Sequence, residues 1–200
     1  SAHGISKSAS NSNRTFKVTQ YQLEVGSQPS SPIITNGTTV TRTADNVART
    51  LGAEFNPNEG TLIFEVSDVR PIAEVSRLLF ISEGSAVENS LGFNLDGVGN
   101  ISAIFNDGIN PAVSSGIFAN VSVGLVKIAL AWRFGDFYSV SANGETPTKI
   151  SLAGTLPLTN SNLWLGSRGG LQGPSSATFK SATYEPKAVS DARLQELSKL

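Results

Sequence analysis

Apolar residues recur at every second position in several short stretches of this chain, and no other feature of the sequence constrains the fold as strongly. In residues 61–67 the apolar positions are Leu62, Phe64 and Val66, and residues 126–134 repeat the pattern over a longer run. A period of two places successive side chains on opposite faces of a β-strand. Because such stretches are short, closely spaced and not separated by helical repeats, they predict an all-β sandwich or barrel.

Other stretches share the composition or spacing of strands. They lie at residues 15–26, 77–82, 91–95, 101–105, 149–152, 162–166 and 177–184. The chain contains 19 glycines and abundant serine and threonine, which suits many turns better than helices. Tyr138 and Val140 form a further strand that leads to Asn143-Gly144, the strongest hairpin signal, because a type I′ turn needs positive φ at both central residues. In total we expect about ten to thirteen strands.

One helix is well marked, close to the end of the chain. Ser190 is a good N-cap residue, and Asp191 suits the positive end of a helix. Leu194 and Leu197 lie three residues apart and form an apolar stripe. Pro186 prevents the preceding strand from continuing. We expect this helix to cover an exposed side or edge of the sandwich, where open strand edges are a liability.

The sequence fits a single domain that follows a short linker. Residues 1–14 are rich in serine and asparagine and lack periodicity, so we expect linker or cloning-derived residues there. Residues 15–200 form the predicted domain, which is long enough to bury a sizeable core. We assign residues 15–26 to this domain, the alternative being that they close a preceding one. The sequence contains no methionine, so we expect a piece or a processed form of a longer polypeptide.

Several classes of function are disfavoured by what the sequence lacks. It has no cysteine, and its one histidine is His3 in the predicted linker, so a Ser-His-Asp triad or a thiolate metal site lacks its residues. No phosphate-binding loop motif is present. The net charge of −1 gives no basic excess for nucleic acid. No apolar run is long enough for a membrane-spanning helix. We therefore expect neither nucleic-acid binding nor membrane insertion.

The carboxylates do not form a recognisable catalytic pattern. Asp96, Asp107 and Asp136 all fall at predicted turns, where aspartate side chains usually bond to the backbone. Glycoside hydrolysis needs two carboxyl groups across one bond, and the E-x-D-x-x-E arrangement of many jelly-roll glucanases is absent. We therefore do not expect an enzyme. A polysaccharide-degrading enzyme that uses these aspartates is the least favoured alternative.

Calcium binding is a second use for the same region. Asp96, Asn100, Asn106 and Asp107 lie near the two ends of one predicted hairpin, and their hard oxygen atoms suit Ca²⁺. However, "LDGVGN" is not an EF-hand loop, and "NDG" is an ordinary turn. No cofactor is therefore predicted, the metal ligands are unknown, and calcium stays an open alternative.

The aromatic residues indicate binding more than the carboxylates do. Trp164 stands between Leu163 and Leu165, so two core-facing leucines would turn its ring to the other face of the sheet. An exposed tryptophan is a suitable platform for the C–H face of a sugar ring. The alternative is that Trp164 packs under a loop or against a second chain. Trp132 shares the parity of Ile128, so we expect it in the core.

Planar polar groups at strand ends complete the predicted ligand-binding set. Arg133, Asp136, Tyr138 and Arg168 suit contacts to sugar hydroxyls or to acidic sugars, although a solvated surface is the simpler interpretation of each. The full set is Trp164, Arg168, Tyr138, Asp136, Arg133, Asn106, Asp107 and Asp96.

The C-terminal stretch "SATYEPKAVSDARLQELSKL" resembles the closing signature of laminin-G-like, concanavalin A-like jelly-roll modules. In that signature a last strand runs into Tyr-x-Pro-basic and then Ser-Asp-x-x-Leu-x-x-Leu. The matching residues are Tyr184, Pro186, Lys187, Ser190, Asp191, Leu194 and Leu197.

Four further segments are similar to the version of this module found in tail-fibre and receptor-binding proteins of tailed bacteriophages. They are residues 21–47 with "QLEVG", 54–67 with "EGTL", 128–145 with the Asn143-Gly144 hairpin, and 163–170 with "LGS". With the C-terminal stretch, the resemblance covers most of residues 20–198.

The resemblance implies a two-sheet antiparallel jelly-roll sandwich with one short C-terminal helix. It also implies a non-catalytic, distal adhesion module of the virion that binds bacterial surface polysaccharide, such as lipopolysaccharide or capsule, within a fibre that is often a homotrimer. The binding residues of the family vary, so the resemblance assigns no site. The main alternative is a structural or trimerisation module of the fibre tip.

Overall fold

A computed structural model of the chain describes residues 34, 37–40, 47–70, 75–83, 89–107, 113–120, 124–153, 162–167 and 175–200. The chain divides into two units, residues 1–44 and residues 45–200. In the first unit the few described residues are exposed. The described part of the second unit contains eleven strands and one helix. The predicted linker at 1–14 and the predicted strand at 15–26 lie outside the described residues, so the predicted domain boundaries stay predictions.

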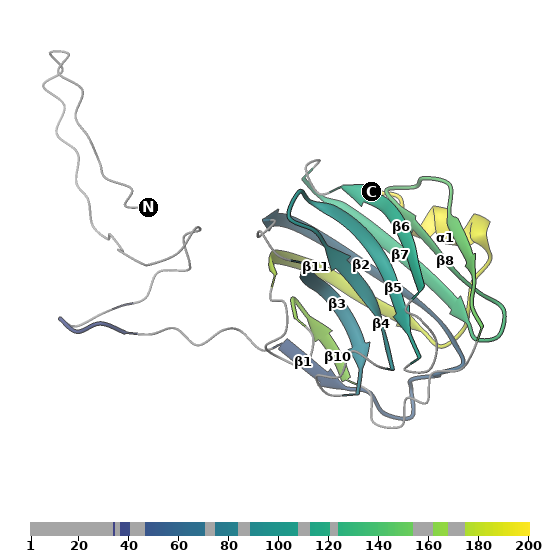
Figure 1. The fold of residues 1–200 in the computed structure, drawn as a ribbon, viewed down its shortest axis with the longest axis horizontal. Coiled ribbons are helices and arrows are strands. Elements are labelled where there is room, and N and C mark those ends of the chain that lie inside the picture. Colours follow the sequence, from purple (N-terminus) through teal and green to yellow (C-terminus); the bar gives the residue numbers. More distant parts are fainter. Residues whose placement is uncertain are drawn as a thin grey trace, which may run out of the picture. The chain divides into compact units, whose positions relative to one another are not determined.

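The strands form two antiparallel sheets that stack face to face (Figure 1). The six-stranded sheet has the order β1 (Val47–Thr50), β10 (Asn162–Leu165), β3 (Ser76–Ser82), β4 (Ser90–Leu95), β5 (Asn100–Asn106) and β6 (Val113–Asn120). The five-stranded sheet has the order β11 (Ser176–Glu185), β2 (Glu59–Arg70), β7 (Val126–Arg133), β8 (Phe137–Ala142) and β9 (Thr148–Ser151). This is the two-sheet jelly-roll sandwich expected from the sequence.

The main hydrophobic core lies between the sheets. It is formed largely by the alternate apolar residues of the strands. Leu62, Phe64 and Val66 of β2 are at most 2% exposed and pack in one cluster with alternate residues of the six-stranded sheet. The rings of Phe64 and Phe93 meet edge to face with their centroids 4.9 Å apart, a favourable aromatic geometry. Trp132 is fully buried in this cluster, as its parity predicted.

A second, smaller cluster lies on the other side of the five-stranded sheet. Helix α1 (Asp191–Leu197) packs there against β7 and β8 (Figure 1). Leu194 is fully buried against Ile63, Ala129 and Ala131. The two alanines are small enough for the helix to approach the sheet closely. The C-terminal helix therefore covers the outer face of a sheet, one of the two places predicted for it.

The helix begins as predicted. Ser190 has extended backbone geometry, and its hydroxyl accepts a hydrogen bond from the amide of Arg193 at 3.4 Å. Asp191 occupies the first turn. Helix α1 has seven residues, and nothing helical in the described part of the chain is long and apolar enough to cross a membrane.

Two strands were not predicted, and both lack the alternating pattern. All four residues of β1 are exposed, so no alternation of buried and exposed residues marks this strand in the sequence. Strand β6 contains Gly116 at φ +69° and pairs with β5 through two register shifts, which interrupt the alternation. By contrast, Asn143 and Gly144 have φ of +51° and +78° at the β8–β9 turn, as the hairpin prediction required.

Candidate functional site

Trp164 lies on the outer face of the six-stranded sheet. In β10, Leu163 and Leu165 pack against the main core, so the side chain between them points to the opposite face. Trp164 pairs with Phe80 of β3 on one side and with Ala48 of the edge strand β1 on the other. It is partly exposed, although its indole Nε1 is shielded and has no hydrogen-bond partner among the described residues. Its ring face, rather than its N–H, is therefore the part that can meet a ligand.

Phe80 and Arg77 of β3 lie on the same side of the sheet as Trp164, and the Phe80 ring is buried. The Phe80 ring lies directly on Gly92 of the neighbouring strand, where a Cβ atom would collide with the ring. The Arg77 guanidinium carbon lies 5.5 Å from the centroid of the Phe80 ring, within the range of a cation–π contact. Arg77 Nη1 also donates a hydrogen bond to Asn94 Oδ1 at 2.5 Å. We call Trp164, Phe80, Arg77 and Asn94 the Trp164 patch.

The surroundings of the Trp164 patch are polar but almost uncharged. Thr50 and Asn162 bond to each other at 2.9 Å beside Trp164. The other described residues that face outward on β1, β10, β3, β4 and β5 are alanine, glycine, serine, asparagine and isoleucine. Among these outward-facing described positions, Arg77 is the one charged residue. Aromatic faces next to amides and hydroxyls are the groups that contact the C–H faces and hydroxyls of a saccharide.

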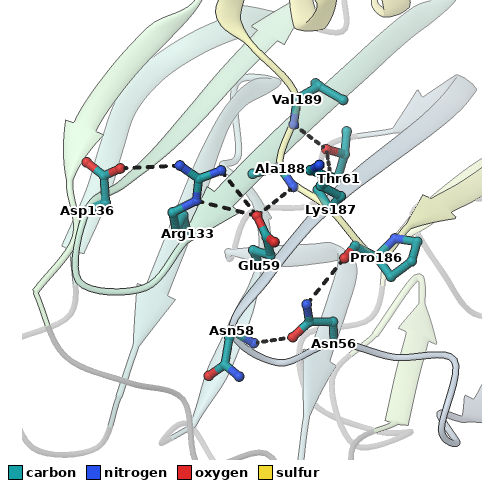
Figure 2. Close-up of polar contacts among 10 residues, drawn as sticks. All are labelled: Asn56, Asn58, Glu59, Thr61, Arg133, Asp136, Pro186, Lys187, Ala188 and Val189. Carbon is teal, nitrogen blue, oxygen red and sulfur yellow. Dashed lines mark hydrogen bonds and ion pairs between the residues drawn. The ribbon is translucent and has the colours of Figure 1, made fainter.

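Two of the predicted ligand-binding residues belong to the other sheet: Arg133 ends β7, and Asp136 lies in the turn between β7 and β8 (Figure 2). Arg133 donates from Nε and Nη2 to Glu59 Oε2, at 3.4 and 3.2 Å, and its Nη1 lies 3.8 Å from Asp136 Oδ2. The guanidinium is thus held between two carboxylates. These carboxylates balance its positive charge, so Arg133 would attract an acidic ligand only weakly.

Glu59 also binds the segment that leads to helix α1 (Figure 2). Its Oε2 accepts a hydrogen bond from the amide of Ala188 at 3.3 Å, and this bond, followed by the neighbouring Arg133, lowers the pKa of the carboxyl. The hydroxyl of Thr61 donates to the carbonyl of Lys187 at 2.7 Å and accepts from the amide of Val189 at 3.1 Å. This network fastens the C-terminal segment to the sheet, so its role is structural.

Asp96 is engaged in the turn between β4 and β5. Its Oδ1 accepts hydrogen bonds from the amides of Val98 and Asn100, at 3.0 and 2.8 Å, and its Oδ2 accepts from the side chain of Asn100 at 2.8 Å. The bonds from Asn100 are the main reason that the pKa of Asp96 is lowered. Asn120 in turn donates to Asn100 Oδ1 at 2.8 Å. The oxygens of this turn are thus largely occupied by the protein itself.

Asn106 and Asp107 lie at the other end of β5. Six residue steps separate Asn100 from Asn106, about 20 Å along an extended strand, so the four oxygen-bearing residues do not meet around one ion. Asp107 is buried, at 3% exposure. Within the described ranges no three or more histidine, aspartate or glutamate residues are grouped so that they could hold a metal ion.

The structure corrects the expectation that Tyr138 presents its hydroxyl at the surface. Tyr138 is fully buried in the main core, where it pairs with Trp132 and Ile150. It shares the parity of Val140, and this signal in the sequence could have placed it correctly. Arg168 lies outside the described residues, and its role stays a prediction.

The predicted residues therefore do not form one site. Trp164 lies on one sheet, Arg133 and Asp136 on the other, and Asp96 and Asp107 at opposite ends of a strand. The neighbours that make Trp164 a candidate site, Phe80 and Arg77, were missed. They are brought to Trp164 by the pairing of β10 with β3, two strands about eighty residues apart in the sequence, and no local pattern reveals that pairing.

The sheet order and the packing define a two-sheet jelly-roll sandwich, and the comparison with solved structures agrees. No protein-family model matches the chain, and no curated protein matches it. The fold is similar to the CBM40 domain of the Ruminococcus gnavus IT-sialidase, with a TM-score of 0.58 and 16% identity, over 72% of this chain and 84% of that one.

Two other solved structures share the fold. The leech intramolecular trans-sialidase matches with a TM-score of 0.57 and 17% identity, over 78% of this chain and 26% of that larger one. A pentraxin from Limulus polyphemus matches with a TM-score of 0.52 and 13% identity, over 74% and 73% of the two chains. At these identities the comparisons establish the fold.

Proposed function

We propose that this chain is a non-catalytic glycan-binding module, and that the Trp164 patch is its binding surface. The observation that carries the proposal is the partly exposed ring of Trp164 on the outer side of the six-stranded sheet, with the buried Phe80 ring, the Arg77 guanidinium and the Asn94 amide on neighbouring strands. Aromatic faces with a few fixed polar groups are typical of saccharide and small-ligand sites. The R. gnavus CBM40 domain, which has a similar fold, is known in complex with sialyllactose.

We further propose that the module belongs to the distal end of a bacteriophage tail fibre and binds the surface polysaccharide of the host bacterium, lipopolysaccharide or capsule. Its support is the ordered set of motifs in residues 20–198 that resemble tail-fibre modules. A virion location and a homotrimeric fibre belong to the same proposal.

The test is binding to bacterial cells and to their purified polysaccharides. We expect the fluorescently labelled protein to decorate wild-type cells of a susceptible strain and not mutants that lack the surface polysaccharide. A lack of signal across a panel of strains and purified polysaccharides would contradict the glycan-binding function. A stable trimer by light scattering, without saccharide binding, would favour the structural alternative instead.

Variants of the patch locate the surface. Trp164→Ala is expected to weaken binding about tenfold or more, because truncating an aromatic anchor removes most of its contact area. Arg193→Ala is the control, since Arg193 lies on helix α1, its side chain is half exposed, and its guanidinium pairs with Glu196 of the same helix. The binding surface is assigned wrongly if both variants bind like the unmodified protein.

A further inference from the structure

We propose that Asn143 is a site of spontaneous deamidation, and that the docked C-terminal residues Gln195, Ser198 and Lys199 control the rate of this reaction. In deamidation the backbone nitrogen of the following residue attacks the side-chain amide of an asparagine. Gly144 follows Asn143, and glycine has no side chain to hinder the attack. The inference is independent of the glycan-binding function proposed above.

The reaction needs hydroxide and water and no other reagent. Hydroxide removes the proton of the Gly144 amide, and the Gly144 nitrogen then forms a bond to Asn143 Cγ. The bond between Cγ and Nδ2 breaks, and Nδ2 takes up a proton from water and leaves as ammonia. Water then opens the cyclic imide at one of its two carbonyl groups, which gives aspartate or isoaspartate. Nothing is oxidised or reduced in these steps.

The turn holds the side chain of Asn143 against strand β7. Asn143 Oδ1 accepts a hydrogen bond from the amide of Lys127 at 2.9 Å, and the backbone amide of Asn143 donates to the carbonyl of Lys127, also at 2.9 Å. Asn143 has φ of +51°, an uncommon conformation for a residue other than glycine. Because these contacts fix both its backbone and its side chain, Asn143 Cγ is not free to turn toward the Gly144 nitrogen.

The C-terminal segment holds the attacking nitrogen. The amide of Gly144 donates to Ser198 Oγ at 3.1 Å, and the Gly144 carbonyl accepts from Gln195 Nε2 at 2.8 Å. Ser198 is fully buried, and its hydroxyl donates to the carbonyl of Gln195 at 3.0 Å and lies 2.8 Å from Ser141 Oγ. The Gly144 amide must give up its bond to this hydroxyl before its nitrogen can attack Asn143.

Release of helix α1 frees this site as a whole. The stem of Lys199 lies over Gly144, where an added Cβ atom would come within 2.9 Å of Lys199 Cγ. Helix α1 is docked through Leu194, which is fully buried against the five-stranded sheet. Detachment of the segment therefore removes the contacts of Gln195, Ser198 and Lys199 together. We expect the reaction to proceed in molecules whose C-terminal segment has detached.

Formation of isoaspartate would make the detachment permanent. Isoaspartate adds one methylene group to the backbone, whereas a type I′ hairpin turn requires a defined conformation at its two central residues. The amide and carbonyl of Gly144 would then no longer meet Ser198 and Gln195. Detachment thus favours the modification, and the modification opposes redocking.

Mass spectrometry of peptides from the full chain, incubated at mildly alkaline pH, measures the conversion of the Asn143 amide to a carboxyl group. The reference is a synthetic peptide with the sequence of residues 138–148. We expect Asn143 to react about tenfold or more slowly in the unmodified protein than in this peptide, because several hydrogen bonds must break first and each contributes up to about tenfold.

Variants of the C-terminal segment complete the test. Ser198→Ala should raise the rate at Asn143 about five- to tenfold, because it removes the acceptor of the Gly144 amide. Leu194→Ala should raise the rate further, because it weakens the docking of the whole segment. Ser181→Ala is the matched control, since Ser181 is an exposed serine of β11. Thermal melting checks that each variant is folded at the incubation temperature.

Either of two results would overturn the inference. The first is a rate at Asn143 in the unmodified protein that equals the rate in the peptide. The second is a rate in Ser198→Ala and Leu194→Ala that equals the rate in Ser181→Ala. Should Ser198→Ala fail to fold, Gln195→Ala takes its place, since it removes the bond to the Gly144 carbonyl.

Discussion

Replacing Leu194 by alanine should destabilise the protein far more than replacing Leu200, although both leucines lie in the last seven residues. Leu194 is fully buried between helix α1 and the five-stranded sheet, whereas Leu200 is 70% exposed. Truncating a buried leucine to alanine costs about 2–5 kcal/mol, with the larger values where the surroundings cannot collapse into the space. The residues around Leu194 decide where in this range the cost of its truncation falls.

The two alanines on the sheet beneath Leu194 cannot fill the space that the substitution leaves. Ala129 and Ala131 have no longer side chain to move into it, and the pairing of β7 with β2 and β8 fixes their backbone. We therefore expect a loss of about 3–4 kcal/mol in the free energy of unfolding. In a domain of this size that corresponds to a fall of roughly 10 °C in the melting temperature.

Urea denaturation and calorimetry of the two leucine variants measure this difference, and hydrogen exchange locates it. Leu200→Ala should stay within about 0.5 kcal/mol of the unmodified protein. If helix α1 detaches as a unit, the amides of residues 191–198 exchange quickly while the sheets stay protected, and the global loss is limited to the docking energy of the helix. A loss below about 1 kcal/mol for Leu194→Ala with these amides still protected would refute the reasoning about packing.

Three further changes test other parts of the structure. Gly92→Ala places a Cβ atom against the Phe80 ring, and we expect it to lower stability by about 1–3 kcal/mol and to weaken glycan binding, measured by thermal melting and titration. Ser190→Ala removes the helix cap and should cost about 1 kcal/mol, which Ser190→Asp should restore. The folded-state pKa of Glu59 is lowered, so its contribution to stability is present above its unfolded pKa of about 4.3 and is lost as the pH falls through the folded value. Glu59→Gln should therefore make the urea midpoint less dependent on pH between about 5 and 3, and an unchanged pH dependence would contradict this.

The parts of the fold that follow a local rule could be predicted from the sequence. Alternation in residues 61–67 and 126–134 identified β2 and β7, because burial on one face of a strand imposes a period of two. The Asn143-Gly144 turn and the Ser190 cap were found because each needs specific residue types for a specific backbone geometry. Each of these signals involves only a few neighbouring residues, so it can be recognised without knowledge of the tertiary contacts.

The candidate site could not be predicted in the same way, because it depends on which strands become neighbours. Phe80 stands in a continuous apolar run, "RLLFIS", where period two is lost and the sequence does not tell which face each residue occupies. Arg77 reads as an ordinary charged residue at the start of that run. Only the pairing of β10 with β3 shows that both belong with Trp164. Tyr138 was misplaced for a different reason: it was grouped with the planar polar side chains at strand ends, although its parity with Val140 places it in the core.

The division of the protein into two hydrophobic clusters bears on how its specificity could change over time. Helix α1, Leu194 and the Glu59 network stabilise the outer side of the five-stranded sheet, where substitutions carry a cost in folding. The partly exposed residues Trp164 and Arg77 lie on the opposite sheet, outside the helix-covered cluster. Mutations there can accumulate without loosening the helix. For the proposed glycan-binding surface, this arrangement allows surface substitutions to change the preferred ligand while the fold is inherited unchanged.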